Sequence, residues 1–354
     1  MALLTTTIGS YPKPDFVKVR DWVHPKSEYK PTYDAYAADK RYFQDKEIST
    51  SIFLGTIDAV RAQVEIGIDV PTDGEQGREH YIFYQLRHLK GVDFNRLQSR
   101  ALRNVEEWCK DVPTISGKIE PQDPFLRYDW QIAQKIANHN NPVKITLPGP
   151  MTIADTVVDE YYGDEPKLNK ALAEALNAEI RDLVDAGCKW IQVDEPLFAR
   201  FPGKALDYGI ENLERCFFSV PYEVNRVVHL CCGYPRELDD PDPLKADQNS
   251  YFKLAGALDE ATVDTVSIED AHRHNDLTLL ERFRNTRIIL GVVAIAKTRI
   301  EAVDEIRDRL TTALHHIDPE RLIVGPDCGL GMLDKDTAHE KLGNLVEAAR
   351  TTQT

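Results

Sequence analysis

Residues 167–195 read KLNKALAEALNAEIRDLVDAGCKWIQVDE, a stretch in which a helical pattern ends and a short apolar run begins. Apolar residues recur at helical spacing in its first part: Leu172, Leu176, Ile180 and Leu183. Gly187 follows as a terminator, because glycine readily adopts the left-handed conformation that ends many helices. The run Trp190–Val193 is rich in β-formers and ends in an acidic pair. The stretch therefore predicts a helix over Lys167–Ala186, followed by a strand with a polar tip.

The same alternation of short β-rich runs and helical patterns extends along the chain. The β-rich runs are Thr5–Gly9, Ile68–Thr72, Thr114–Ile119, Val143–Leu147, Trp190–Val193, Val227–Cys231, Thr265–Ile268, Ile288–Ala294 and Leu322–Val324. Strands that alternate with helices pair in parallel, and about eight such units favour a closed barrel over an open sheet. We therefore expect an α/β fold, a single (β/α)8 TIM barrel with an N-terminal extension and short insertions. Nine runs compete for eight places, so one lies outside, and the two options are Thr5–Gly9 and Thr114–Ile119.

One domain over residues 1–354 is the simplest organisation, because a barrel with insertions accounts for a chain of 354 residues. No internal repeat or low-complexity tract indicates a second unit. A further helix is expected over Arg299–His315. The segment Pro235–Ser250 is acidic and rich in proline, so we expect a surface loop there and not a linker between domains.

The composition is that of a globular protein with an acidic balance. Hydrophobic residues make up 42% of the chain, and the net charge of −15 argues against nucleic acid or an anionic membrane as partner. The longest apolar run, Ile288–Ala296, is too short to span a bilayer, and no signal peptide is visible. Six cysteines in a chain of this length do not suggest a disulfide scaffold. We therefore expect a cytoplasmic protein in a reducing environment.

Residues suited to catalysis gather at the predicted carboxyl ends of the strands, where barrels of this class carry their active sites. These tips are Asp73-Gly74-Glu75, Asp194-Glu195, His229 with Cys231, Glu269, and Asp327-Cys328. Because residues i and i+2 of a strand share a face, His229 and Cys231 can both point into the barrel mouth. Two thiolates, an imidazole and a carboxylate form a sensible zinc set. The predicted ligands are His229, Cys231, Glu269 and Cys328; the alternative is two buried cysteines and a histidine with an ordinary hydrogen bond.

The sulfur-rich ligand set indicates the type of reaction. A barrel of this size needs no structural metal to fold, so the metal is expected to be reactive. Two thiolates make zinc a poor activator of water, but they suit a site where an incoming thiol binds the metal, loses its proton and stays nucleophilic. Glu269 is the ligand expected to yield its place, because a carboxylate binds zinc less softly than a thiolate. These arguments predict alkylation of a small thiol.

Seven short motifs also match a known family in their order along the chain. They are Thr5-Thr6-Thr7-Ile8-Gly9-Ser10-Tyr11-Pro12, Asp73-Gly74-Glu75, Leu147-Pro148-Gly149-Pro150-Met151-Thr152, Ile191-Gln192-Val193-Asp194-Glu195-Pro196, His229-Leu230-Cys231, Ser267-Ile268-Glu269 and Pro326-Asp327-Cys328-Gly329-Leu330. The chain resembles, over nearly its whole length, the catalytic C-terminal barrel of cobalamin-independent methionine synthase. The resemblance implies zinc ligation by His229, Cys231, Glu269 and Cys328. It also implies binding of the thiol substrate by Ser10, Glu75 and Asp194, with Ile8 and Gly9 beside Ser10 in the same motif.

The chemistry of homocysteine agrees with these acceptor residues. Glu75 and Asp194 could hold its ammonium group and so fix the acceptor for the reaction. Ser10 and nearby backbone N–H groups could take the carboxylate. The alternative is structural: residues 73–75 cap a strand, and Glu195-Pro196 merely begins a loop.

Two positions depart from the family pattern, and both concern a folate donor. Thr156 stands in the place of a tryptophan that helps to hold the folate, and Ala296 in that of a histidine thought to protonate the departing nitrogen. That nitrogen is a poor leaving group without a general acid. We therefore expect the residues that activate the thiol to be intact and those that serve a folate donor to be altered. His272, His274 and Lys297 lie near strand tips and could supply a proton, but each is expected to be an exposed loop residue.

This pattern is similar to single-barrel relatives, whereas the full-length synthase has two barrels in tandem. Some relatives are thought to take methyl from a methylated corrinoid protein; others, the epoxyalkane:coenzyme M transferases, open an epoxide with a zinc-bound thiol. We therefore expect a Zn²⁺-dependent methyltransferase that converts homocysteine to methionine, with a folate or corrinoid donor. One alternative is epoxide opening, in which a sulfonate-bearing thiol would need a cluster of basic residues that the matched motifs lack. The other is a barrel that binds zinc or a small thiol without catalysis.

Overall fold

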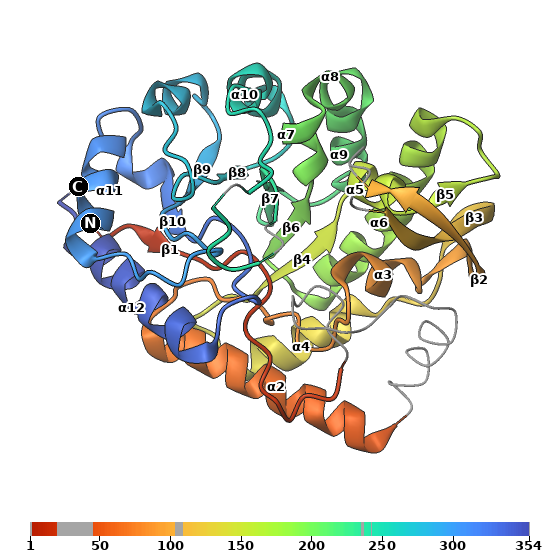
Figure 1. The fold of residues 1–354 in the computed structure, drawn as a ribbon, viewed down its shortest axis with the longest axis horizontal. Helices are drawn as coiled ribbons and strands as arrows, with labels where there is room; N and C mark the ends of the chain where they lie inside the picture. Colours follow the sequence, from red (N-terminus) through yellow and green to blue (C-terminus); the bar gives the residue numbers. More distant parts are fainter. Residues whose placement is uncertain (1, 20–44, 103–108, 235–236, 242, 354) are drawn as a thin grey trace.

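The computed structural model describes residues 2–19, 45–102, 109–234, 237–241 and 243–353 (Figure 1). Its centre is a seven-stranded sheet in the order β1-β10-β9-β8-β7-β6-β4, in which every neighbouring pair is parallel. The strands are β1 (Leu4–Thr5), β4 (Lys144–Pro148), β6 (Trp190–Asp194), β7 (Asn225–Leu230), β8 (Thr265–Ile268), β9 (Arg287–Gly291) and β10 (Leu322–Gly325). The sheet curls around the middle of the molecule and helices cover its outer side, which confirms a parallel α/β fold.

The two edges of the curled sheet approach the segment 68–72, which was predicted as a strand. Thr6 of one edge forms an isolated parallel bridge with Val70, and Lys144 of the other edge forms one with Thr72. Pro71 lies between the two bridges and has no N–H to donate, so a continuous ladder is interrupted there. The segment therefore forms two single bridges where a regular eighth strand was expected.

Helices follow the strands and alternate with them along the chain. Those of at least seven residues are α2 (Lys46–Ile66), α4 (Leu126–Ala137), α6 (Glu165–Ala186), α9 (Ile210–Cys216), α10 (Ser250–Glu260), α11 (Val303–Ala313) and α12 (Lys335–Thr351). Shorter helices are α3 (Tyr81–Leu86), α5 (Pro150–Asp155), α7 (Pro196–Arg200) and α8 (Pro202–Lys204), with the π-helical turn η3 (Ala205–Gly209) and the 3-10 turns η4 (Leu277–Arg282) and η5 (Pro319–Arg321). The prediction for α6 is confirmed: its apolar face is buried, and Gly187 ends it with a φ of 105°. Helix α11 is shorter than the predicted Arg299–His315.

A small second sheet stands beside the central one. Its antiparallel strands β2 (Leu89–Ala101) and β3 (Cys109–Pro121) form a long hairpin, to which β5 (Val158–Asp159) adds in parallel (Figure 1). Of the two runs proposed to lie outside the barrel, Thr114–Ile119 is therefore the one that does, whereas Thr5–Gly9 supplies β1. Strand β2 was not predicted, because its sequence has few apolar residues and no clean alternation.

The core lies between the curled sheet and the helices around it, and the chain ends meet on its outer side. The backbone N–H of Leu3 donates to the carbonyl of Ala349 in α12, so β1 and the last helix adjoin. Within the described residues, none of the helices has both the length and the apolar character that crossing a membrane requires.

Candidate active site

A cavity of about 210 Å³ opens at the carboxyl ends of the central strands and collects most of the predicted site residues. Those that line it are Ile8, Gly9, Ser10, Glu75, Asp194, His229, Cys231 and Cys328. Glu269 does not line the cavity, but its Oε1 lies 3.0 Å from the Sγ of Cys231. Because these residues come from several strand tips far apart in the sequence, the curled sheet is what brings them together.

Three of the predicted metal ligands form one cluster. The ligand atoms of His229, Cys231 and Cys328 all lie within 4.8 Å of one another. His229 belongs to β7 and Cys231 follows that strand at once, so the two residues share a face, whereas Cys328 comes from the turn after β10. One ring nitrogen and two sulfurs at this spacing form a set of donors that fits zinc.

The imidazole of His229 is held in the form that binds metals. Its Nδ1 lies 2.9 Å from the Oγ of Ser267, and its Nε2 is buried without a hydrogen-bond partner in the described part of the chain. Burial, with the positive charge of Lys144, lowers the pKa of His229 to about 3, so the ring is neutral at physiological pH. A neutral ring with one nitrogen oriented and the other buried and unpaired is what a metal site requires.

Without a cation nearby, the Cys328 thiol holds its proton firmly. A hydrogen bond with Cys231 and then burial raise the pKa of Cys328 well above its usual value. A divalent cation between the two sulfurs reverses this preference, because it stabilises thiolates directly. The sulfur pair is therefore a site whose protonation depends on whether a metal is bound.

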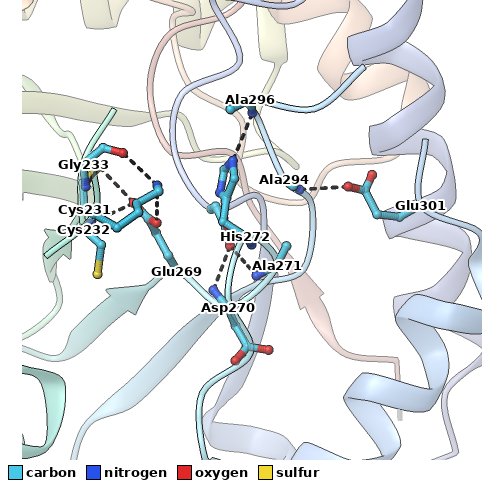
Figure 2. Close-up of polar contacts among 12 residues, drawn as sticks. Cys231, Cys232, Gly233, Glu269, Asp270, Ala271, His272, Ala294, Ala296 and Glu301 are labelled. Carbon is cyan, nitrogen blue, oxygen red and sulfur yellow. Dashed lines mark hydrogen bonds and ion pairs between the residues drawn. The ribbon is translucent and has the colours of Figure 1, made fainter. Parts of the chain in front are cut away.

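Glu269 is oriented by a lysine that the sequence did not point to. The Nζ of Lys245 lies 2.7 Å from the Oε2 of Glu269, and both side chains are only 5% exposed. The backbone N–H of Cys232 donates to the other carboxylate oxygen at 2.8 Å, as Figure 2 shows. Burial lowers the pKa of Lys245, but the charges of Glu269 and Cys231 outweigh this effect and raise it above the usual value. Lys245 is therefore an ammonium ion beside the cluster of predicted ligands.

A second group of possible ligands, Glu269, His272 and Asp327, lies next to the first. The carboxylate of Asp327 already accepts hydrogen bonds from the backbone N–H groups of Asp270, Ala271 and His272, at 2.7–2.9 Å. His272 contacts Asp327 through its Nδ1 at 2.5 Å, and its Nε2 accepts from the N–H of Ala296 at 3.1 Å (Figure 2). This group is satisfied without a metal and fixes the loop after β8.

The interpretation of His272 as an exposed residue is wrong, because its side chain is only 3% exposed. His274 is exposed as predicted, and Lys297 is half-buried with its Nζ on the carbonyl of Asp240. None of the three is among the residues that line the cavity. Ala296 is buried outside that lining as well, whereas Thr156 belongs to it.

Glu75 lines the cavity from a tight turn. Its backbone has a positive φ of 55°, and its Oε1 accepts from the Oγ1 of Thr146 at 2.7 Å. A Cβ atom at Gly9 would lie 2.8 Å from that oxygen, so the glycine leaves room for the carboxylate. Asp73 accepts from the N–H of Glu75 at 3.1 Å and so fixes the turn.

Asp194 lies at the end of β6, where its carboxylate is mostly buried. Its Oδ1 accepts from the Nε2 of Gln192 at 2.7 Å, and the same amide donates to the carbonyl of Ile8. Burial raises the pKa of Asp194 well above its usual value, and the charge of Glu75 raises it further. A buried carboxylate with a second carboxylate nearby is suited to a cationic ligand group.

Ser10 joins the N-terminal segment to the turn that carries Cys328. Its carbonyl accepts from the N–H of Leu330 at 2.7 Å, and its Oγ accepts from the N–H of Gly331 at 3.3 Å. These contacts fix the Ser10 hydroxyl in the lining of the cavity, beside the backbone that follows Cys328.

Glu195 and Arg78 have structural contacts that the sequence did not reveal. Glu195 caps α5 by accepting from the N–H groups of Met151 and Thr152, and it does not line the cavity. Arg78 is buried in the cavity wall, where it contacts Asp73 at 3.3 Å and donates to the carbonyl of Thr146 at 2.9 Å. An arginine three residues after a predicted acidic tip was a signal that could have been used.

Comparison with known proteins identifies similar chains. A family model described as the catalytic domain of cobalamin-independent synthase matches residues 3–351. A methionine synthase from Sulfolobus acidocaldarius is 30% identical over 350 residues, which cover 98% of this chain and 91% of the relative. One from Pyrococcus furiosus is 28% identical, with 98% and 92% covered. A solved B12-independent methionine synthase from Shewanella sp. W3-18-1, in complex with selenomethionine, is 29% identical with a TM-score of 0.84, and covers 99% of this chain and 97% of its own.

Proposed function

Because this chain belongs to the family of cobalamin-independent synthase catalytic domains, it is a methyltransferase, and we propose that it methylates the thiol of homocysteine to give methionine. The cavity carries this proposal, since one lining brings together a cluster of sulfur and nitrogen donors and the carboxylates of Glu75 and Asp194. The Shewanella relative was solved with selenomethionine, the selenium analogue of that product, which supports the same acceptor.

The metal in this proposal is zinc, held by His229, Cys231 and Cys328, with Glu269 as a fourth ligand that yields to the thiol. Zinc lowers the pKa of a bound thiol and leaves the thiolate nucleophilic. Ser267 orients the ring of His229, so that Nε2 points at the two sulfurs. Ligand thiols need a reducing environment, and we therefore retain the cytoplasm as the proposed compartment.

The acceptor's charged groups are proposed to bind away from the metal cluster. Glu75 and Asp194 hold the ammonium group, which would offset the repulsion between the two carboxylates. Ser10, with the adjoining backbone of Ile8 and Gly9, receives the carboxylate. The thiol then extends toward Cys231 and Cys328.

The donor carries the methyl group and can be a small molecule or a methylated corrinoid protein. The epoxide alternative requires a sulfonate-bearing thiol, for which the cavity offers mainly acidic side chains. Lys13 and Arg78 are also in its wall. The Nζ of Lys13 donates to the carbonyl of Arg78 at 2.7 Å, and Arg78 is paired with Asp73 and Glu75. We therefore favour an amino-acid thiol as acceptor.

We also propose that residues 1–354 act as one barrel domain, with the segment 68–72 in the eighth place. The two parallel bridges of this segment connect the edges of the curled sheet. The curated relatives that match this chain are nearly as long as the matched region, which agrees with a single catalytic unit.

The proposal is tested by loading the purified chain with zinc and supplying homocysteine with isotopically labelled donors. Methyl-folate, methylcobalamin and a short epoxide are compared by mass spectrometry of the products. Labelled methionine that depends on zinc is the expected result. An alkylated thiol from the epoxide alone would favour the transferase alternative, and no product with any donor, despite bound zinc and homocysteine, would favour a binding protein.

A further inference from the structure

Lys245 is a buried cation beside the proposed metal cluster, and it comes from a segment predicted to be a surface loop. Its Nζ donates to the Oε2 of Glu269 and to the carbonyl of Gly233, both at 2.7 Å. The ammonium group therefore bridges the Glu269 carboxylate and the backbone that follows Cys231. The lysine is thus a fixed partner for this carboxylate inside the protein.

The segment that carries Lys245 is anchored on both sides of this residue. The N–H of Ala246 donates to the carbonyl of Cys232 at 2.8 Å, and Arg273 donates to the carbonyl of Ala246 at 2.7 Å. On the other side, Arg200 donates to the carbonyl of Leu244 at 3.3 Å. The ammonium group is therefore held in place by the backbone around it.

Glu269 is satisfied in its present position without a metal. Its Oε1 receives the N–H of Cys232 and the thiol of Cys231, while its Oε2 receives Lys245. It does not belong to the cluster of His229, Cys231 and Cys328. The carboxylate thus lies next to the cluster, 3.0 Å from the Sγ of Cys231, and is paired with the lysine.

We propose that Lys245 is a positioning residue. It would pair with the carboxylate of Glu269 when an acceptor thiol displaces that carboxylate from the metal. This inference rests on the proposed function. In the exchange the carboxylate leaves the metal, the sulfur takes its place, and the thiol proton is released to solvent. The site gains one negative charge, and the ammonium of Lys245 neutralises the displaced carboxylate, which would otherwise remain buried without a partner.

The test is a double-mutant cycle between Lys245 and Glu269 on the zinc-loaded full chain. Homocysteine binding is measured by calorimetry, and zinc affinity by competition with a chromophoric chelator, so neither readout needs turnover. Lys245→Met, or Lys245→Gln if the first does not fold, is compared with Glu269→Gln and with the double variant. Lys253→Met is the matched control, because Lys253 is 52% exposed and pairs with Asp247 on the surface.

We expect Lys245→Met to weaken homocysteine binding by at least roughly thirtyfold, as loss of a buried charge partner typically does. Zinc affinity without thiol should be retained or increased, since Glu269 then stays on the metal. In the Glu269→Gln background the same lysine substitution should change homocysteine binding little. The inference would be overturned if Lys245→Met weakened homocysteine binding equally in the unaltered chain and in the Glu269→Gln background, or did not weaken it at all. It would also be overturned if Lys245→Met lost its zinc. If the unaltered chain shows no zinc-dependent binding of homocysteine, both the proposed function and this inference are wrong.

Discussion

The Oγ of Ser267 lies 2.9 Å from the Nδ1 of His229 across the neighbouring strands β7 and β8. If this nitrogen carries the ring proton and donates it to the hydroxyl, Nε2 is left with its lone pair facing Cys231 and Cys328. The residue two before Glu269 therefore orients the imidazole ring that belongs to the proposed ligand cluster.

Ser267→Ala should lower zinc affinity by roughly 10–100-fold, the usual effect of removing a group that orients a ligand. Chelator competition measures this change, and circular dichroism checks the fold. Thr265→Val is the control, because Thr265 lies on the same face of β8 and its buried hydroxyl has no partner in the described residues. Equal losses in the two variants would show that packing, and not ring orientation, is affected.

Cys328→Ser should remove most of the bound zinc and abolish methyl transfer while leaving the sheet folded. Cys232→Ser is a close comparison, since Cys232 follows Cys231 directly but donates to the hydroxyl of Tyr251, a contact that serine can keep. Metal content by mass spectrometry distinguishes the two. Full zinc occupancy and turnover in Cys328→Ser would contradict the ligand assignment.

Asp194→Asn should weaken binding of homocysteine by about 2–5 kcal/mol, because the amide cannot neutralise the acceptor's ammonium group. A simple alkyl thiol without an amine should bind the variant and the unaltered chain alike. Calorimetric titration with both thiols gives the comparison. Similar losses for both would mean that Asp194 supports the cavity shape and does not bind the ammonium.

The parts of the fold that followed a regular pattern could be predicted from sequence. Helix α6 and strands β6 to β10 were found because each carries its own periodicity and end signals. Part of β3 was predicted as the run Thr114–Ile119, but β2 and its pairing with β3 were missed, because that pairing depends on contacts between strands and not on a local pattern. The missing regular strand at 68–72 has a similar cause, because Pro71 interrupts the ladder.

In the candidate site too, some residues could be predicted from local sequence patterns and others could not. His229, Cys231 and Cys328 could be grouped because strand ends meet at one edge of a parallel sheet. Lys245 could not, since nothing in an acidic, proline-rich segment indicates that one lysine turns inward to pair with Glu269. His272 was misjudged for a related reason: its burial depends on Asp327 and Ala296, both distant in sequence.

Lys144→Met should stabilise the protein near neutral pH by on the order of 2–5 kcal/mol. Lys144 is fully buried, and its Nζ has no hydrogen-bond partner among the described residues. Burial lowers its pKa from 10.5 to about 7, although Asp194 opposes the shift. Between these values the unfolded chain binds more protons than the folded one, so stability should rise with pH over this range.

Denaturant titrations between pH 6.5 and 10.5 measure this effect. The advantage of Lys144→Met should be largest below pH 7 and shrink as pH rises, because deprotonation removes the cost of the buried charge. Lys170→Met is the control, since Lys170 is 55% exposed on α6. A pH-independent gain would show that packing alone is responsible.

The cavity also predicts that methyl-folate is a poor donor. Thr156 lines the cavity in the place that the family gives to a tryptophan, and its hydroxyl donates to the carbonyl of Thr152. Tyr81 and Tyr234 remain in the wall, so the loss of stacking, worth roughly 1–3 kcal/mol, is the smaller effect. The absence of the general acid has the larger effect, because a positioned general acid contributes about 10²–10⁴-fold in rate.

His272 does not replace that acid in the arrangement observed. Its Nε2 accepts the N–H of Ala296, so its single ring proton lies on Nδ1 and is directed at Asp327, away from the cavity lining. We therefore expect methyl-folate to support methionine formation several orders of magnitude more slowly than a donor whose leaving group needs no proton, such as methylcobalamin. Single-turnover rates with each donor at equal concentration provide the measurement. Rapid methionine formation from methyl-folate as sole donor would contradict this expectation and would require His272 to leave Asp327 and turn toward the substrate.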